Sequence, residues 1–145
     1  MFDLNQCVGF ITNVASKTLS DALNNKLMEH GVTKSQWIAM YNINKEKNLT
    51  QKSLSDLMGA KESTITGILD RLERENLILR QEDVNDRRKK NLVLTDKGEL
   101  INKKLTGIAQ EFRDICLSEV SEEDQKVFLE VLDKMVIAAL AWKKE

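Results

Sequence analysis

The chain has 145 residues, of which 41% are hydrophobic and 31% are charged, and its formal net charge is -1 at pH 7. These values predict one soluble globular domain with a core of ordinary size and exclude an intrinsically disordered chain. They also exclude a general polycationic field, so any nucleic-acid binding has to come from locally placed cations.

Cysteine content and hydropathy predict where the protein resides. No apolar run approaches the roughly 20 residues of a membrane span, and the first residues lack the pattern of a signal peptide. The two cysteines, Cys7 and Cys116, do not have metal-ligand spacing, which is typical of reduced thiols in a cytosol. We therefore expect a cytoplasmic protein with no membrane contact and no metal.

The first predicted element is a long amphipathic helix over about residues 3–30. Residues at spacings of three and four form one stripe along it: Leu4, Val8, Ile11, Val14, Thr18, Ala22 and Leu23. Gly31 ends this helix, because glycine is favoured just past a helix end. Thr33 and Gln36 then form a capping box that opens a second helix, which ends in the polar stretch 44–48.

Residues 49–74 predict two short helices joined by a turn. Thr50 caps the first, since its hydroxyl can accept from the unpaired amides of the first turn, and Gly59 ends it. Its apolar residues have helical spacing: Leu54, Leu57 and Met58. The second begins near Lys61, with its apolar residues on one face: Ile65, Ile68, Leu69 and Leu72. Two helices joined by a tight turn containing glycine are the helix-turn-helix unit.

A hairpin is predicted next, from two short β-prone runs at residues 77–82 and 91–95. The polar tip between them, residues 83–90, ends in four consecutive cations, Arg87 to Lys90. A basic hairpin after a helix-turn-helix is the winged form, and its tip suits the phosphate backbone or the minor groove. The alternative is a solvated hairpin that is merely charged, and its position directly after the helix-turn-helix favours the DNA-binding interpretation.

Two long helices complete the chain. Thr95 caps the first, which keeps an apolar stripe as far as Cys116, a residue we expect in the core. Ser121 opens the last helix, which repeats apolar residues by fours: Val127, Phe128, Val131, Leu132, Met135, Val136, Ala139 and Leu140. Long helices at both ends with wide apolar stripes predict intertwining with a second chain. The alternative is an intramolecular bundle.

Three segments in this order and spacing carry a resemblance to a known family. They are the helix 64–73, the Asp86-Arg87-Arg88 signature of the wing, and Leu94-Thr-Asp-Lys-Gly98. The stretch around them resembles the DNA-binding lobe of the MarR family of winged-helix regulators. The resemblance covers the whole chain, residues 1–145, because the flanking helices sit where that family places its dimerisation helices.

The resemblance implies a mainly α fold with a small β-hairpin wing, in which a winged helix-turn-helix is flanked by long dimerisation helices. Within a single MarR-like domain the winged lobe would span about residues 33–95, and the dimerisation lobe residues 1–30 plus 96–145. It further implies a sequence-specific transcriptional regulator that binds an inverted-repeat operator in double-stranded DNA as a homodimer. Two recognition helices would enter major grooves one turn, roughly 34 Å, apart. Repression is favoured over activation because occluding a site needs no further surface.

Several side chains are placed to contact DNA. Hydroxyls in the early turns of the recognition helix can reach base edges or phosphates: Ser63, Thr64 and Thr66. Lys61 can take a phosphate, and Glu62 can accept from a cytosine amine. The start of the preceding helix would face the backbone with Thr50, Gln51, Lys52 and Ser53. For Arg71 two interpretations stay open, a phosphate contact or an ion pair with Glu75.

In the wing, the family pattern implies that Asp86 orients Arg88, which enters the minor groove. A carboxylate that holds the guanidinium beforehand reduces the rotamer entropy lost on binding. Phosphate contacts would come from Arg87, Lys89 and Lys90. The chain departs from the family pattern at Lys61, where a capping serine is frequent, and at Gly67, where a basic residue is common.

The resemblance also implies an effector, a small aromatic or phenolic anion bound between the two lobes. Candidate ligand-binding residues by type are His30, Trp37, Met40 and Tyr41. The alternative places Trp37 and Met40 in the core and gives His30 a role at a helix end, where a cation favours the dipole.

Cys7 raises a redox alternative, since the peroxide-sensing branch of the family uses a cysteine near the start of its first helix. That branch surrounds the thiol with tyrosines, and the first helix here has none. Reactive thiolates need an electropositive or hydrogen-bonded setting. The other interpretation of Cys7 is a small buried apolar residue.

Two other classes of function are alternatives to DNA binding. An enzyme would need a phosphate-cradling loop, a metal-ligand cluster or a nucleophile paired with a base, and the sequence has none of these. The sequence also predicts no cofactor. A winged helix that only contacts other proteins is the second rival, and it would lack salt-dependent binding to a duplex.

Overall fold

The first long helix begins later than the sequence predicts. The computed structural model describes residues 1 and 3–142. It places a short 3-10 helix, η1, at Leu4–Gln6 and the helix α1 at Val8–Met28. Between them Cys7 is extended, with φ -73° and ψ 109°, so the prediction of one helix from residue 3 was wrong. The side chain of Asp3 accepts from the amide of Asn5 at 2.9 Å, which caps η1 as a separate turn. At the other end Gly31 has a positive φ of 75°, as expected for a stop.

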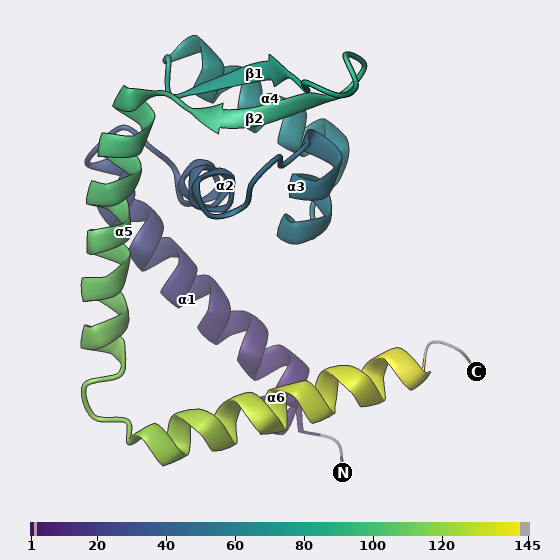
Figure 1. Cartoon of the computed structure of the whole chain (residues 1–145). Helices are drawn as coiled ribbons and strands as arrows, with labels where there is room; N and C mark the ends of the chain where they lie inside the picture. The colour runs from purple at the N-terminus through teal and green to yellow at the C-terminus, as the bar shows by residue number, and fades with distance from the viewer. Residues whose placement is uncertain (2, 143–145) are drawn as a thin grey trace. The chain divides into compact units, whose positions relative to one another are not determined.

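The middle of the chain forms the helix-turn-helix (Figure 1). The helix α2 spans Lys34–Lys45 and opens with the complete capping box of Thr33 and Gln36. The helices α3 and α4 span Gln51–Met58 and Glu62–Arg74, within one residue of the boundaries expected from their caps. Their apolar faces meet in the core, where Leu54, Ile65 and Leu69 are fully buried. Leu57 is an exception to the predicted face of α3, because it is exposed.

A two-stranded antiparallel hairpin follows α4. The strands β1, Ile78–Glu82, and β2, Lys90–Leu94, pair with Ile78 opposite Leu94 and Glu82 opposite Lys90. The buried side chains lie at the root and in the middle of the hairpin and belong to the hydrophobic core: Leu77, Ile78 and Leu92. The predicted wing is therefore confirmed, with its polar loop shortened by one residue because Lys90 joins β2.

The helices α5, Asp96–Cys116, and α6, Glu122–Trp142, complete the described chain. The hydroxyl of Thr95 accepts from the amide of Gly98 at 3.0 Å and so caps α5 as predicted. The buried residues of α5 lie in its first half: Gly98, Asn102 and Leu105. Cys116, expected in the core, is exposed because it lies at the far end of this helix.

The chain divides into two compact units, Met1–Gln110 and Glu111–Glu145. The described fold of helices plus a two-stranded hairpin is the mainly α winged helix-turn-helix expected from the sequence. The hydrophobic core lies in the first unit, built on α2, α3, α4 and the hairpin with Leu27 and Leu105 from the flanking helices. Among the described helices, none combines the length and the apolar character that crossing a membrane requires.

Candidate nucleic-acid interface

The turn between α3 and α4 is held by local hydrogen bonds. The Thr50 hydroxyl accepts from the Ser53 amide at 3.2 Å, which caps α3. Gly59 adopts the left-handed conformation with φ 59° and ends it. The Ser55 hydroxyl donates to the carbonyl of Ala60 at 2.6 Å, so the chain entering α4 is fixed from inside the lobe. Lys61 occupies the N-cap of α4 without a side-chain capping bond, so the first amides of α4 have no partner from that side chain.

The hydroxyls of α4 have different surroundings. The side-chain Nε2 of Gln51 donates to Thr66 Oγ1 at 2.7 Å, and Thr66 Oγ1 donates to the backbone carbonyl of Glu62 at 2.9 Å. Thr66 therefore ties α4 to the start of α3. Ser63 and Thr64 are exposed in the first turns of α4, where their hydroxyls face solvent. Of the three predicted contacts, these two are placed to reach outward.

The tip of the wing is organised by Asp83, a residue that the sequence analysis did not select. One carboxylate oxygen, Oδ1, accepts from the amides of Asn85 and Asp86 at 2.8 and 3.1 Å, and Oδ2 accepts from the Asn91 side chain at 2.9 Å. The bond from Asn91, followed by those from the two amides, lowers the pKa of the Asp83 carboxyl below its ordinary value. The run Asp-Val-Asn-Asp contains the turn chemistry that could have indicated this role.

Arg88 is held by Asp86 while its side chain projects into solvent. Its Nε donates to Asp86 Oδ1 at 3.1 Å and its Nη2 to Oδ2 at 3.4 Å. The Arg88 side chain is 91% exposed, against 29% for Asp86. This side-chain bond, together with one from the Arg88 amide, lowers the pKa of the Asp86 carboxyl. The guanidinium is thus oriented and remains accessible to an anion.

Residues of the wing and of the helix-turn-helix line the same hollow. It is lined by the start of α3, the start of α4 and the basic end of the wing: Thr50, Gln51, Lys52, Glu62, Arg88, Lys89 and Lys90. Four of these side chains are cationic and one is anionic, on a chain whose net charge is -1. The cations are therefore concentrated in this hollow, where they can attract an anion such as a phosphate group.

Seven of the other predicted DNA-contact residues are exposed outside this hollow: Ser53, Lys61, Ser63, Thr64, Thr66, Arg71 and Arg87. Asp86, the last of the set, is half-buried. Within the described residues Arg71 makes no ion pair with Glu75, so that alternative is not realised. The carboxylates on this stretch of α4 pair instead with Arg80 of β1, which contacts Asp70 and Glu73. No sequence signal marked Arg80, because its contacts depend on how the strand packs against the helix.

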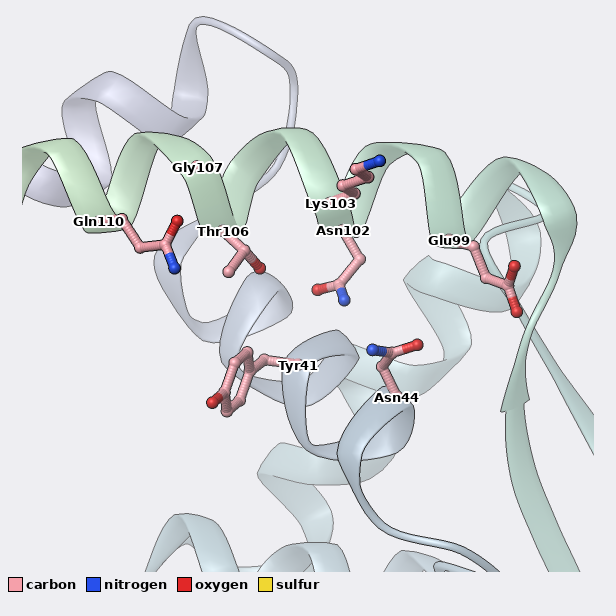
Figure 2. A pocket seen from close by; sticks show the side chains of 8 residues that line it. All are labelled: Tyr41, Asn44, Glu99, Asn102, Lys103, Thr106, Gly107 and Gln110. Atoms are coloured by element: carbon pink, nitrogen blue, oxygen red, sulfur yellow. The ribbon is translucent and has the colours of Figure 1, made fainter.

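A second hollow, of about 620 Å³, lies between α2 and α5 (Figure 2). Most of the residues that line it have polar side chains: Tyr41, Asn44, Glu99, Asn102, Lys103, Thr106, Gly107 and Gln110. Asn102 is only 4% exposed, and its Oδ1 has no hydrogen-bond partner in the described part of the chain. A buried acceptor without a donor costs free energy.

The four candidate ligand-binding residues fall in different places. Tyr41 lines the α2–α5 hollow, and the Trp37 ring lies 5.9 Å from the Tyr41 ring between centroids. The Trp37 indole donates to Thr106 Oγ1 at 3.3 Å. Met40 is fully buried in the core, and His30 is exposed just beyond α1. Cys7, the redox candidate, is half-buried at the start of α1.

Over the described residues, no group of three or more histidine, cysteine, aspartate or glutamate side chains is arranged to hold a metal ion.

Comparison with known proteins extends these observations. Residues 32–90 match the sequence profile of the MarR family. The HTH-type transcriptional regulator SarZ of Staphylococcus epidermidis is 26% identical over 134 residues, which cover 92% of this chain and 88% of SarZ.

Solved structures are similar over nearly the whole length. The MepR protein of S. aureus, solved in complex with DNA, is 25% identical with a TM-score of 0.83, covering 91% of this chain and 96% of MepR. The PcaV transcriptional regulator of Streptomyces coelicolor, solved with its natural ligand, has the same fold at 24% identity, with a TM-score of 0.82 over 96% of this chain and 98% of PcaV. Residues 32–90 thus resemble the MarR family, and over nearly its whole length the chain is similar to the HTH-type transcriptional regulator SarZ and to the DNA-bound protein MepR.

Proposed function

We propose that the protein represses transcription by binding an inverted-repeat operator in double-stranded DNA as a homodimer. The observation that carries this proposal is the hollow where α3, α4 and the wing gather Lys52, Arg88, Lys89 and Lys90. A local cluster of this kind gives phosphate contacts to a chain that has no overall positive charge. MepR, which has the same fold, is solved bound to DNA.

Base recognition is assigned to the first turns of α4. The exposed hydroxyls of Ser63 and Thr64 would contact base edges, with Glu62 accepting from a cytosine amine. Arg88, held by Asp86, would enter the minor groove. The remaining cations and backbone-facing groups would position the duplex through phosphates: Thr50, Gln51, Ser53, Lys61, Arg71, Arg87, Lys89 and Lys90.

The homodimer is supported by apolar side chains that the single chain leaves exposed. On the N-terminal segment and α1 these include Leu4, Val8, Ile11 and Val14, each between 46% and 49% exposed. In α6 none of the described residues is buried, and Phe128 is 61% exposed. Exposed apolar stripes of this extent mark surfaces that another chain covers. In this proposal the winged lobe spans residues 33–95, and the terminal helices form the dimerisation lobe.

Regulation by a small molecule is the second part of the proposal. The α2–α5 hollow offers an aromatic ring at Tyr41, a cation at Lys103 and the Asn102 side chain. A phenolic acid fits this set, because it combines a ring, a carboxylate and a hydroxyl donor. PcaV is solved with its natural ligand. Titration of the DNA complex with salicylate and 4-hydroxybenzoate, for the wild type and for Asn102→Ala, tests this part. Release that is the same in both variants would contradict it.

The DNA-binding proposal is tested by selecting duplexes from a random pool with purified protein at about physiological salt. We expect an inverted repeat with half-sites one turn apart, and affinity that falls with increasing salt. A matched selection with Ser63→Ala separates base reading from phosphate binding. Loss of the Ser63 hydroxyl should weaken the base preference within the half-site without changing the salt dependence of the affinity. Binding to duplexes that does not depend on salt, or no binding, would contradict the proposal.

A further inference from the structure

Arg80 connects the wing to the recognition helix. It lies at the centre of β1, opposite Leu92 of β2, and its side chain is 20% exposed. Its Nη2 donates to Asp70 Oδ1 at 2.8 Å, and its Nη1 donates to Glu73 Oε2. Both carboxylates belong to α4, the helix that carries Ser63 and Thr64. One guanidinium therefore bridges two acids spaced three residues apart on the helix, so that they lie on the same face.

Polar contacts attach each strand of the hairpin to the helices, in addition to its apolar packing. On the β2 side, the Leu92 amide donates to the carbonyl of Leu49 at 2.8 Å, and Asn91 forms a bridge with Thr50. These contacts tie β2 to the start of α3. On the β1 side, the residues flanking Arg80 are exposed, namely Leu79, Gln81 and Glu82. Beyond Ile78, the β1 side chain that is partly buried is Arg80, so the second attachment depends on it.

The chemistry of this attachment requires arginine. Partial burial opposes the charge, but the bond to Asp70 and the charge of Glu73 outweigh it and raise the pKa of Arg80. A planar guanidinium can donate from two nitrogens to two separate carboxylates, whereas an ammonium is a compact point charge without that fork. Lysine at this position would keep the charge and lose part of the geometry.

We propose that Arg80 is a positioning residue for DNA binding, which fixes the wing against α4 so that Arg88 and the recognition helix engage the duplex together. The inference rests on the proposed function, since it assigns Arg80 a role only if both elements contact DNA. Arg80 itself acts through Asp70 and Glu73 and not through a phosphate. Without the bridge, the position of the wing relative to α4 would have to be fixed at the moment of binding, which weakens affinity.

The test is a double-mutant cycle between Arg80→Gln and Arg88→Ala. Affinity is measured for a fluorescently labelled selected duplex at fixed salt, or for a random-sequence duplex at low salt if selection recovers no motif. We expect Arg80→Gln to weaken binding about tenfold, with Arg80→Lys intermediate. In the Arg80→Gln background, Arg88→Ala should cost less than about threefold, because residues that act as one unit are not additive.

A second variant distinguishes positioning from direct phosphate contact. The pair Asp70→Asn with Glu73→Gln removes both carboxylate charges that Arg80 contacts and makes the chain less negative by two charges. Positioning predicts weaker DNA binding by this pair, whereas a phosphate contact by Arg80 predicts tighter binding. Arg113→Gln, which removes a cation paired with Asp114 on α5, is the matched charge control and should change affinity less than about twofold.

The outcomes separate this inference from the proposed function. The inference is supported if Arg80→Gln and Arg88→Ala together weaken DNA binding by less than the product of their separate effects, and if the Asp70→Asn, Glu73→Gln pair also binds more weakly. Multiplicative effects, or tighter binding by the acid pair, overturn the role of Arg80 while the DNA-binding proposal stands. A wild type that binds neither duplex overturns the proposed function and this inference with it. If Arg80→Gln does not fold, Arg80→Lys and the acid pair carry the same comparison.

Discussion

The wing and the terminal helices differ in how far one chain satisfies their side chains. At the wing tip, Asp83 and Asp86 accept hydrogen bonds from neighbouring amides and side chains, and Arg88 is held in place. In α6 none of the described residues is buried, and α1 buries only Leu27. Apolar surface exposed on this scale is unfavourable in water. The winged lobe is therefore organised within one chain, whereas the terminal helices have a surface suited to a second.

The largest expected effect is a loss of stability where Gly98 of α5 contacts the backbone of Leu77, which precedes β1. A Cβ on Gly98 would lie 2.0 Å from the backbone carbonyl oxygen of Leu77, and backbone cannot move aside cheaply. We expect Gly98→Ala to lower the free energy of unfolding by roughly 2–4 kcal/mol, measured by urea denaturation. The matched control is Gly107→Ala on the same helix, where nothing lies within 4 Å. It should be neutral or stabilising by about 0.5–1 kcal/mol. Equal effects at both positions would refute this account.

The second effect concerns the exposed stripe of α6. Phe128→Glu combined with Val131→Glu places two charges on that stripe, and burying unpaired charges in an interface is costly. We expect the dimer to dissociate at concentrations about 100-fold higher than for the wild type, measured by sedimentation. Spectra of residues 33–95 should stay native-like, since that lobe has its own core.

The control for the α6 variant changes net charge by the same amount on polar positions. Lys126→Gln with Lys134→Gln also makes the chain more negative by two charges, and both lysines are exposed on α6. This pair should leave the mass unchanged. A monomeric wild type, or a dimer that tolerates the two glutamates, would show that α6 does not form the interface.

The third effect is at Arg88. Arg88→Ala should weaken operator binding about tenfold or more while the fold and the dimer persist, because the side chain is 91% exposed and contacts Asp86 in the described structure. The measurement is a titration of labelled duplex at moderate salt, with sedimentation as a check on assembly. Unchanged affinity would remove Arg88 from the site. The measured affinity would show whether the ordered wing tip contacts DNA or whether the Asp86–Arg88 pair only stabilises the tip.

Local signals in the sequence predicted much of the fold. Thr50, Gly59 and the capping box of Thr33 set helix ends through bonds within a few residues, so the boundaries of α2, α3 and α4 agree with the structure. The break at Cys7 was missed because the apolar stripe runs through it without interruption. The cap that Asp3 supplies to η1 is a competing local signal.

The candidate site was less accessible to sequence reasoning. The residue types of α4 and the wing indicated DNA binding, and the hollow at Thr50, Glu62 and Arg88 brings several of them together. The contacts that hold this arrangement join residues distant in the chain, such as Gln51 with Thr66 and Arg80 with Asp70. Such pairs follow from how helices and strands pack, and no single-element pattern predicts them.

The smallest expected effect is the pH response of the wing tip. The folded-state pKa values of Asp83 and Asp86 lie below the ordinary aspartate value, about 3.9. Their contribution to order in the wing is therefore complete above that pH and is lost as pH falls through the lowered values. Amide resonances of Asn85 and Arg88, followed by NMR, should keep their native shifts down to about pH 4. Asn91→Ala removes the largest cause of the Asp83 shift, so the pKa of Asp83 should rise toward its ordinary value. An equal pKa of Asp83 in the wild type and in Asn91→Ala would mean that the Asn91 bond does not organise the tip. The wing would then depend less on hydrogen bonds within its own chain than the contrast with α6 requires.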